Sequence, residues 1–208
     1  MPDPERRFKI CLTGGPGAGK TAVAQLMKRQ FGDFVYVVPE SATILYSGGL
    51  SRARNIAEQF YVQRAIYELQ RQQEEIADLR TQDESQAKLI LCDRGTLDFA
   101  AYWDGSPEEF LFDASSSLEA ELARYDLLIH METPTGGDYQ LDARVRVEDV
   151  EKALELDHRI AEAWVRHPRR HFVKSRSSFI EKVEEVISII NESVRLYSSN
   201  EQVISRDS

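Results

Sequence analysis

The residues best suited to chemistry form a glycine-rich segment near the start of the chain, Gly14-Gly-Pro-Gly-Ala-Gly-Lys20-Thr21. The segment fits the pattern G-x-x-x-x-G-K-[ST] at every fixed position, and it lies between a strand-like run (8–13) and a helix-like run (20–30). Glycines allow successive backbone N–H groups to face one anion, and a helix start adds partial positive charge. We therefore expect this segment to bind phosphate groups, the alternative being a glycine turn that binds nothing.

The spacing also assigns roles to individual residues of the segment. Lys20 is expected to reach the β- and γ-phosphates of a nucleoside triphosphate, and the Thr21 hydroxyl to bind Mg²⁺. The residues expected to hold the nucleotide are Gly14, Gly15, Gly17, Ala18, Gly19, Lys20, Thr21 and Ala22.

Three further strand-like runs end in ionisable residues. Glu40 follows 35–38, Asp93 and Arg94 follow 88–92, and Glu132 follows 126–131. Ligands of an open parallel sheet bind at the carboxyl ends of its strands, so these residues are candidates for a site. Glu40 would accept a proton from an acceptor hydroxyl or orient it, Asp93 would hold Mg²⁺ directly or through water, and Arg94 would neutralise phosphoryl charge.

Each of these residues also has an ordinary structural interpretation. Glu40 could cap the helix that follows it, and Asp93 and Arg94 could form an ion pair on the surface. The position of these side chains relative to the phosphate-binding segment decides between the catalytic and the structural interpretation.

A polar loop after the fourth predicted strand carries Arg144 and Arg146. Guanidinium groups that a mobile lid brings over a transferring phosphate accelerate transfer by about 10³–10⁵-fold. We expect residues 133–147 to form such an arginine lid, with Arg144 and Arg146 as catalytic residues. The alternative is a solvated turn of alternating charges.

The whole chain alternates strand-like and helix-like runs. Strands are predicted at 8–13, 35–38, 88–92, 126–131 and 170–173, and helices at 20–30, 52–83, 106–112, 115–124, 147–166 and 177–190. Continuous apolar strands that alternate with helices are typical of a parallel sheet covered on both faces. The sequence therefore predicts a three-layer α/β/α fold, with one domain over 1–208, a core over about 8–190 and a polar tail over about 198–208.

Composition limits the classes of partner. The chain has 208 residues, a formal net charge of −9 and 29% charged residues, which is a globular composition. Its acidity argues against a protein that coats nucleic acid or an anionic membrane, and no apolar run approaches the ~20 residues of a membrane span. The charged, proline-containing start is unlike a secretory signal, so we expect a cytoplasmic protein in which Cys11 and Cys92 are buried thiols.

Two classes of nucleotide-hydrolysing protein lack their sequence signals here. A GTPase would carry an Asn-Lys-x-Asp motif, and none of Asn55, Asn191 and Asn200 begins one. A motor ATPase usually has two adjacent carboxylates at the end of its magnesium strand, whereas Asp93 is followed by arginine. These absences favour a kinase.

The motifs resemble those of the P-loop nucleoside and nucleotide kinases. The residues that carry the resemblance are Gly14 to Thr21, Val38-Pro39-Glu40, Cys92-Asp93-Arg94-Gly95 and the two lid arginines. The match is closest to small AAA-type ATP-binding proteins related to the ribosylnicotinamide kinase domain, and it spans about residues 8–190. The resemblance implies ATP and Mg²⁺ as cofactors and a five-stranded sheet of order 2-3-1-4-5.

The resemblance also implies an acceptor pocket beside the long helix. Glu40 matches the acidic base of deoxynucleoside kinases, and Asp93 and Arg94 match their acidic-Arg-Ser motif except that Gly95 replaces the serine. Gln63 is placed like a base-contacting glutamine, although Tyr61 and Val62 separate it from Phe60. Asp98, Tyr102 and Trp103 are expected near the pocket.

Two functions fit these observations. The first is an ATP- and Mg²⁺-dependent phosphotransferase that acts on a small nucleoside- or nucleotide-like acceptor. The alternative is a nucleotide-gated NTPase that regulates a partner. A cavity beside Glu40 and Arg94 favours the first, and an open apolar surface favours the second. The sequence leaves the acceptor, ATP against GTP as donor, and the oligomeric state open.

Overall fold

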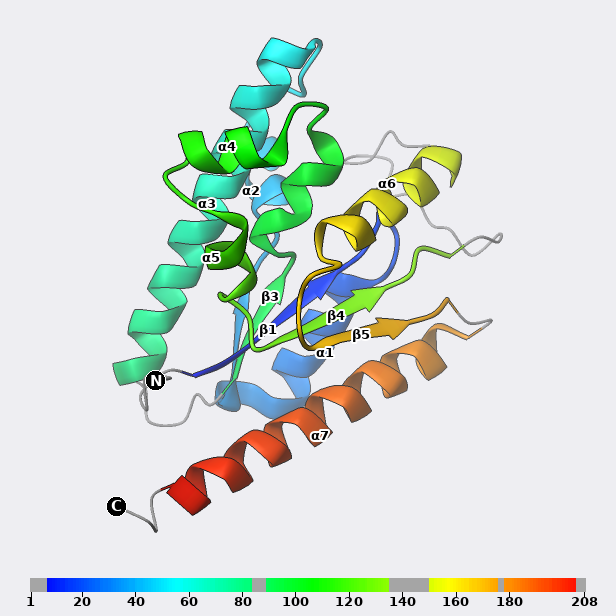
Figure 1. Ribbon diagram of the computed structural model, residues 1–208. Coiled ribbons are helices and arrows are strands. Elements are labelled where there is room, and N and C mark those ends of the chain that lie inside the picture. Colours follow the sequence, from blue (N-terminus) through cyan, green and yellow to red (C-terminus); the bar gives the residue numbers. More distant parts are fainter. Residues whose placement is uncertain (1–6, 84–88, 135–149, 176–177, 205–208) are drawn as a thin grey trace.

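The structure, a computed structural model, describes residues 7–83, 89–134, 150–175 and 178–204 (Figure 1). The strands are β1 (Phe8–Thr13), β2 (Val35–Val38), β3 (Leu89–Asp93), β4 (Leu127–Met131) and β5 (Arg170–Val173). The α-helices are α1 (Lys20–Phe31), α2 (Ser41–Ser47), α3 (Ile56–Asp83), α4 (Pro107–Asp113), α5 (Leu118–Leu122), α6 (Val150–Ala163) and α7 (Phe179–Ile204). Two 3₁₀ helices, η1 (Gly32–Phe34) and η2 (Thr96–Tyr102), complete the described elements.

The five strands form one sheet of order β2-β3-β1-β4-β5, in which every neighbouring pair is parallel. This confirms the order that the resemblance implies. β1 is central, and its two neighbours β3 and β4 come much later in the sequence. The carboxyl ends of β1, β2 and β3 therefore meet at one edge of the sheet, where the candidate residues follow the strands.

Helices cover both faces of the sheet, as predicted. α1 and α7 lie on one face, and α3, α4, α5 and α6 lie on the other (Figure 1). Successive side chains of a strand point to opposite faces of the sheet, so each strand contributes residues to the cores on both faces. In β3, for example, Leu89 and Leu91 pack toward α1, whereas Ile90 and Cys92 pack toward α3.

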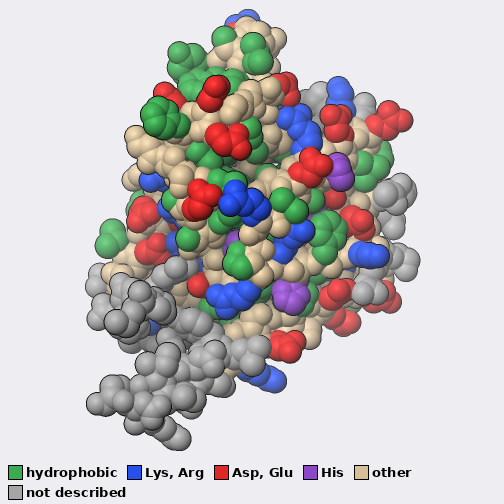
Figure 2. Space-filling view, in the orientation of Figure 1, with side chains coloured by type: hydrophobic (Ala, Val, Ile, Leu, Met, Phe, Trp, Pro, Cys, Tyr) green, Lys and Arg blue, Asp and Glu red, His purple; other side chains and the backbone are tan. Residues whose placement is uncertain are grey.

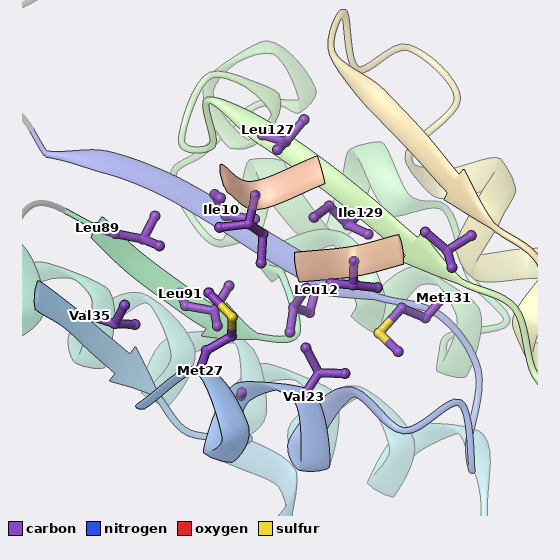
Figure 3. Packing of buried hydrophobic residues seen from close by; sticks show 14 of the residues in the cluster. Ile10, Leu12, Val23, Met27, Val35, Leu89, Leu91, Leu127, Ile129 and Met131 are labelled. Atoms are coloured by element: carbon purple, nitrogen blue, oxygen red, sulfur yellow. The ribbon is translucent and has the colours of Figure 1, made fainter. Parts of the chain in front are cut away.

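The core beneath α1 consists of close-packed aliphatic side chains (Figure 3). Val23 and Met27 of α1 belong to the same buried cluster as the strand residues Leu12 and Ile129. This packing fixes the start of α1 against the end of β1. It thereby holds the glycine-rich segment that joins them.

Several element boundaries differ from the prediction. α2 and η2 were not predicted: each is seven residues long, and neither begins with a capping serine side chain as the short helices α4 and α5 do. α7 continues to Ile204, so the predicted helix end at 190 is wrong. Residues 191–204 contain no proline or glycine, and an exposed helix face can be polar.

Cys11 and Cys92 are both buried free thiols, as expected. They are direct partners in the β1–β3 pairing, and burial raises the pKa of both. No helix in the described part of the chain has the length and apolar character to cross a membrane. On the face that Figure 2 shows, acidic and basic side chains are interspersed.

Gly95 departs from the serine of the kinase motif for a steric reason. A Cβ atom at this position would lie 2.4 Å from Cζ2 of Trp164 and 2.7 Å from Sγ of Cys11. Trp164 is fully buried and follows α6, so the glycine allows a large aromatic side chain to pack against β1 and β3.

We expect Gly95→Ala to lower the free energy of unfolding by about 1–3 kcal/mol through overpacking. Gly48→Ala is the matched control, since a Cβ atom there would come no closer than 3.2 Å to a neighbouring atom. Urea unfolding of both variants measures the effect. Equal stability of Gly95→Ala and the wild type would contradict this packing argument.

Candidate active site

The glycine-rich segment forms a tight loop between β1 and α1. Gly14, Gly17 and Gly19 have φ angles of 125°, 74° and 92°, which side chains with a Cβ rarely adopt. A Cβ atom at Gly14 would also lie 2.1 Å from the carbonyl oxygen of Met131. The loop therefore requires glycine at these positions, and the motif reflects a backbone shape suited to an anion.

Contacts from later parts of the chain hold this loop from outside. The Gly15 N–H donates to Oδ1 of Asp157 on α6 at 2.6 Å, and the Thr133 hydroxyl donates to the Pro16 carbonyl at 3.2 Å. On the other side, Nζ of Lys182 on α7 donates to the Ala18 carbonyl at 2.9 Å. Sequence reasoning missed Asp157 and Lys182, because neither belongs to a motif and both lie more than 140 residues from their partners.

Lys20 is buried in the first turn of α1 and folds back over the loop. Its Nζ donates to the carbonyl oxygens of Gly14 and Gly15, each at 2.7 Å. Burial lowers the pKa of the Lys20 ammonium to about 7, and the nearby positive charge of Arg94 acts in the same direction. Lys20 is thus a desolvated cation that a polyphosphate would stabilise.

Arg94 joins three strand ends at this edge of the sheet. Its Nε donates to Oε1 of Glu40 at 2.5 Å, and one guanidinium nitrogen lies 3.3 Å from the Gly14 carbonyl oxygen and 3.5 Å from Oδ2 of Asp98. The Arg94 backbone has a φ of 88°, and its N–H donates to the Leu12 carbonyl at 2.9 Å. Strained backbone of this kind costs about 1–3 kcal/mol and clusters at functional sites.

Glu40 faces the glycine-rich segment Gly14 to Thr21, which we call the phosphate loop, and it does not cap a helix. It occupies the N-cap position of α2, but its carboxylate makes no capping hydrogen bond to the helix backbone. Burial by itself would raise the pKa of Glu40; Arg94, the Thr43 hydroxyl and Lys20 outweigh burial and lower this pKa to about 2. Glu40 is therefore a carboxylate at any physiological pH.

Asp93 and Thr21 offer oxygen ligands to a metal ion. Asp93 is buried, its Oδ1 has no hydrogen-bond partner, and burial together with Glu40 raises its pKa. A hydrogen bond with Thr21 lowers that pKa only in part. A buried carboxylate oxygen without a partner is costly, and a cation would relieve this cost. The residues fit Mg²⁺, which keeps most of its ligands as water and phosphate oxygens.

The alternative interpretation of Asp93 and Arg94 as a surface ion pair is wrong. Both side chains are largely buried, and Arg94 pairs with Glu40 and Asp98. Glu132, the third acidic residue at a strand end, lies apart from this group. Its carboxylate accepts a hydrogen bond from the Ser175 N–H at 2.7 Å, beside β5.

A pocket opens beside the Glu40–Arg94 pair, between α2, α3 and η2. It encloses about 770 Å³ of empty space, counting its open mouth. The residues that line it are Pro16, Glu40, Ser41, Ala42, Thr43, Tyr46, Arg52, Gln63, Ile66, Tyr67, Gln70, Arg94, Gly95, Thr96, Asp98, Phe99 and Tyr102. The structure thus places Gln63, Asp98 and Tyr102 in the pocket lining, whereas Trp103 packs against Phe60 and Phe110.

Gln70 of α3 connects the two sides of this site and was missed in the sequence. Its Nε2 donates to the Arg94 carbonyl at 3.1 Å, and its Oε1 accepts from the Ser41 hydroxyl at 2.8 Å. It also donates to Glu74, one helical turn further along α3. The available signal was a pair of polar residues, Gln70 and Glu74, spaced i, i+4 on a helix that packs on the sheet.

The structure brings Lys20, Glu40, Asp93 and Arg94 together around the phosphate loop. Arg144 and Arg146 lie outside the described residues, as does most of the predicted lid, 133–147. Their proximity to the loop therefore stays a prediction.

The pKa of Lys20 leads to a pH dependence of nucleotide binding. A bound triphosphate raises this pKa, so above pH 7 the protein must take up a proton when it binds. The dissociation constant of a fluorescent ATP analogue with Mg²⁺ should therefore rise between pH 7.5 and 9, approaching tenfold per pH unit. In Lys20→Arg, which stays charged, it should stay nearly constant. Equal slopes in the two proteins would contradict the assignment.

Comparisons with known proteins place this geometry in a family. Solved structures that share the fold include deoxyadenosine kinase from M. mycoides with dCMP and a flexible dCDP bound, and thymidylate kinase from Ehrlichia chaffeensis. They are 15% and 14% identical to this chain, with TM-scores of 0.54 and 0.57. Each match covers 89% of this chain, and 100% and 99% of the respective kinase.

A search of curated proteins gives no match. A family model described as an AAA domain matches residues 9–182, which extend from β1 into α7. This range includes the phosphate loop, the Glu40–Arg94 pair and the pocket. The chain therefore belongs to this family of P-loop AAA domains.

Proposed function

We propose that this protein is an ATP- and Mg²⁺-dependent phosphotransferase whose acceptor is a small nucleoside- or nucleotide-like molecule. The observation that carries the proposal is the pocket beside the phosphate loop, whose lining includes both Glu40 and Arg94. A transferase needs such a second site within reach of the γ-phosphate, whereas an NTPase that only gates a partner does not.

The donor half of the site would use the loop and two oxygen ligands. The backbone from Gly14 to Ala22 would surround the phosphates, and Lys20 would leave the Gly14 and Gly15 carbonyls for the β- and γ-phosphates. Thr21 and Asp93 would hold Mg²⁺, which neutralises phosphate charge.

The acceptor half would depend on Glu40. With a pKa of about 2, this carboxylate is a weak base but a permanent hydrogen-bond acceptor. Phosphoryl transfer depends mainly on positioning and electrostatics, so a fixed carboxylate suffices to orient an acceptor hydroxyl. Arg94 would keep Glu40 in place and stabilise charge near the transferring group.

Arg144 and Arg146 complete the proposal as lid residues. Within the described residues of the site, Lys20 supplies positive charge at the phosphate loop, whereas the charge of Arg94 is already paired with Glu40 and Asp98. Additional guanidinium groups would supply the positive charge that a loose transition state requires.

The direct test is ADP release from Mg·ATP in the presence of nucleosides, nucleotides and ribosylated vitamins, with a reaction lacking acceptor as control. We expect release that depends on one class of acceptor, and a loss of about 10³-fold in Lys20→Ala. Thermal unfolding shows whether Lys20→Ala remains folded. Release that ignores every acceptor would instead favour the partner-gating NTPase.

Glu40→Gln separates orientation of the acceptor from nucleotide binding. We expect kcat to fall about 10²-fold or more, with the dissociation constant of ATP nearly unchanged. Thr43→Val is the matched control, because it removes the hydroxyl that donates to Glu40 but keeps the carboxylate. A Glu40→Gln enzyme with weakened ATP binding and normal turnover would contradict this role.

A further inference from the structure

The end of the pocket remote from Glu40 carries an arginine of its own. α2 starts directly after Glu40, and Tyr46 follows six residues later, which places it about 9 Å further along the helix axis. Arg52 lies over the Tyr46 ring, with its Cζ 4.7 Å from the ring centroid. Both residues line the same pocket as Glu40 and Arg94.

Arg52 differs from the other arginines of this region in its partners. Arg94 is engaged by Glu40 and Asp98, and the neighbouring Arg54 pairs with Glu58 at 3.0 Å. Among the described residues, Arg52 makes neither an ion pair nor a hydrogen bond; its recorded contact is with the Tyr46 ring. Its charge is therefore available to a ligand in the pocket.

Stacking on tyrosine suits this guanidinium to bind an anion. The aromatic face attracts the cation, and it orients the guanidinium plane while its N–H edges remain open. Those edges match the paired oxygens of a carboxylate or phosphate. A neutral acceptor would leave the exposed Arg52 guanidinium to solvent.

The lining between the two ends suits a ring. Phe99 and Tyr102 are aromatic, and Gln63 contributes a largely buried side-chain amide. A planar ring with a polar edge would fill this space and use the amide.

We propose that the acceptor carries a carboxylate or phosphate at the end opposite its reacting hydroxyl, and that Arg52, held by Tyr46, binds this group. The inference rests on the proposed phosphotransferase function and narrows its substrate class. It favours acidic nucleoside-like molecules over neutral nucleosides. Arg52 is then a specificity residue that acts on acceptor binding and leaves the transfer step unchanged.

Matched acceptor pairs test this proposal. Nicotinic acid riboside and nicotinamide riboside differ by a carboxylate in place of a carboxamide, and adenosine 3′-monophosphate differs from adenosine by a phosphate. Calorimetry without ATP measures binding of each compound, and ADP release measures transfer. We expect tighter binding of the anionic member in at least one pair, by about tenfold. A preference in the riboside pair would show that Arg52 binds a carboxylate, and a preference in the adenosine pair would show that it binds a phosphate.

Variants then assign the preference to Arg52. Arg52→Ala should abolish it, raising the KM of the anionic acceptor about tenfold with kcat nearly unchanged. Arg52→Lys should retain part of it, because the charge remains without the planar edges. Arg54→Ala, which alters a neighbouring arginine that pairs with Glu58, should leave the preference intact.

The results separate failure of this inference from failure of the proposed function. Equal binding within both pairs, no binding of any member, or a preference that survives in Arg52→Ala would overturn the role of Arg52. Acceptor-dependent ADP release would in that case still support the phosphotransferase. An anion preference in calorimetry without any acceptor-dependent ADP release would support the Arg52 site but contradict the proposed function.

Discussion

The buried ion pair between Arg94 and Glu40 is the contact on which the rest of the site depends. It joins the end of β3 to the start of α2, and through the Gly14 carbonyl it reaches the phosphate loop. A buried charge without a partner is strongly destabilising, so each residue requires the other. The strained backbone of Arg94 is held by Leu12 and Gln70 on either side, which directs the guanidinium toward Glu40. The carboxylate that would orient an acceptor is thereby held in place by contacts within the chain.

The phosphate loop shows how a short motif depends on distant support. Its glycines permit the backbone shape, but Asp157 and Lys182 hold that shape from two different helices. Burial by itself would raise the pKa of Asp157, but His130 and the backbone hydrogen bonds from Gly15 and Thr133 together outweigh burial and lower this pKa, so a negative charge stays beside the Gly15 N–H. The Lys20 ammonium meanwhile donates hydrogen bonds to two carbonyl oxygens of the loop. Contacts within the chain thus hold the loop, and a triphosphate would replace the two carbonyls as the partner of Lys20.

The sequence predicted what local patterns determine. The five strands, their parallel arrangement and the phosphate loop follow from apolar runs and from glycine spacing, and the sheet order was implied by the kinase resemblance. Residues that act through long-range contacts belong to no motif: Gln70 gains its role from Ser41 and Arg94, and Asp157 from Gly15. Likewise, Gly95 looked like a departure from the kinase motif until the position of Trp164 explained it. Arg52 was overlooked because it lies between helices and outside any motif.

A double-mutant cycle on Glu40 and Arg94, with the free energy of unfolding as the measured quantity, tests whether this buried ion pair holds the site together. Urea unfolding of the wild type, Glu40→Gln, Arg94→Gln and the double variant gives the coupling energy. We predict that each single variant is destabilised by about 3 kcal/mol or more, since the remaining partner stays buried. The double variant should lose less than the sum of the two single losses, with a coupling of about 1–3 kcal/mol. Additive effects, or single variants as stable as the wild type, would contradict the central role of this pair.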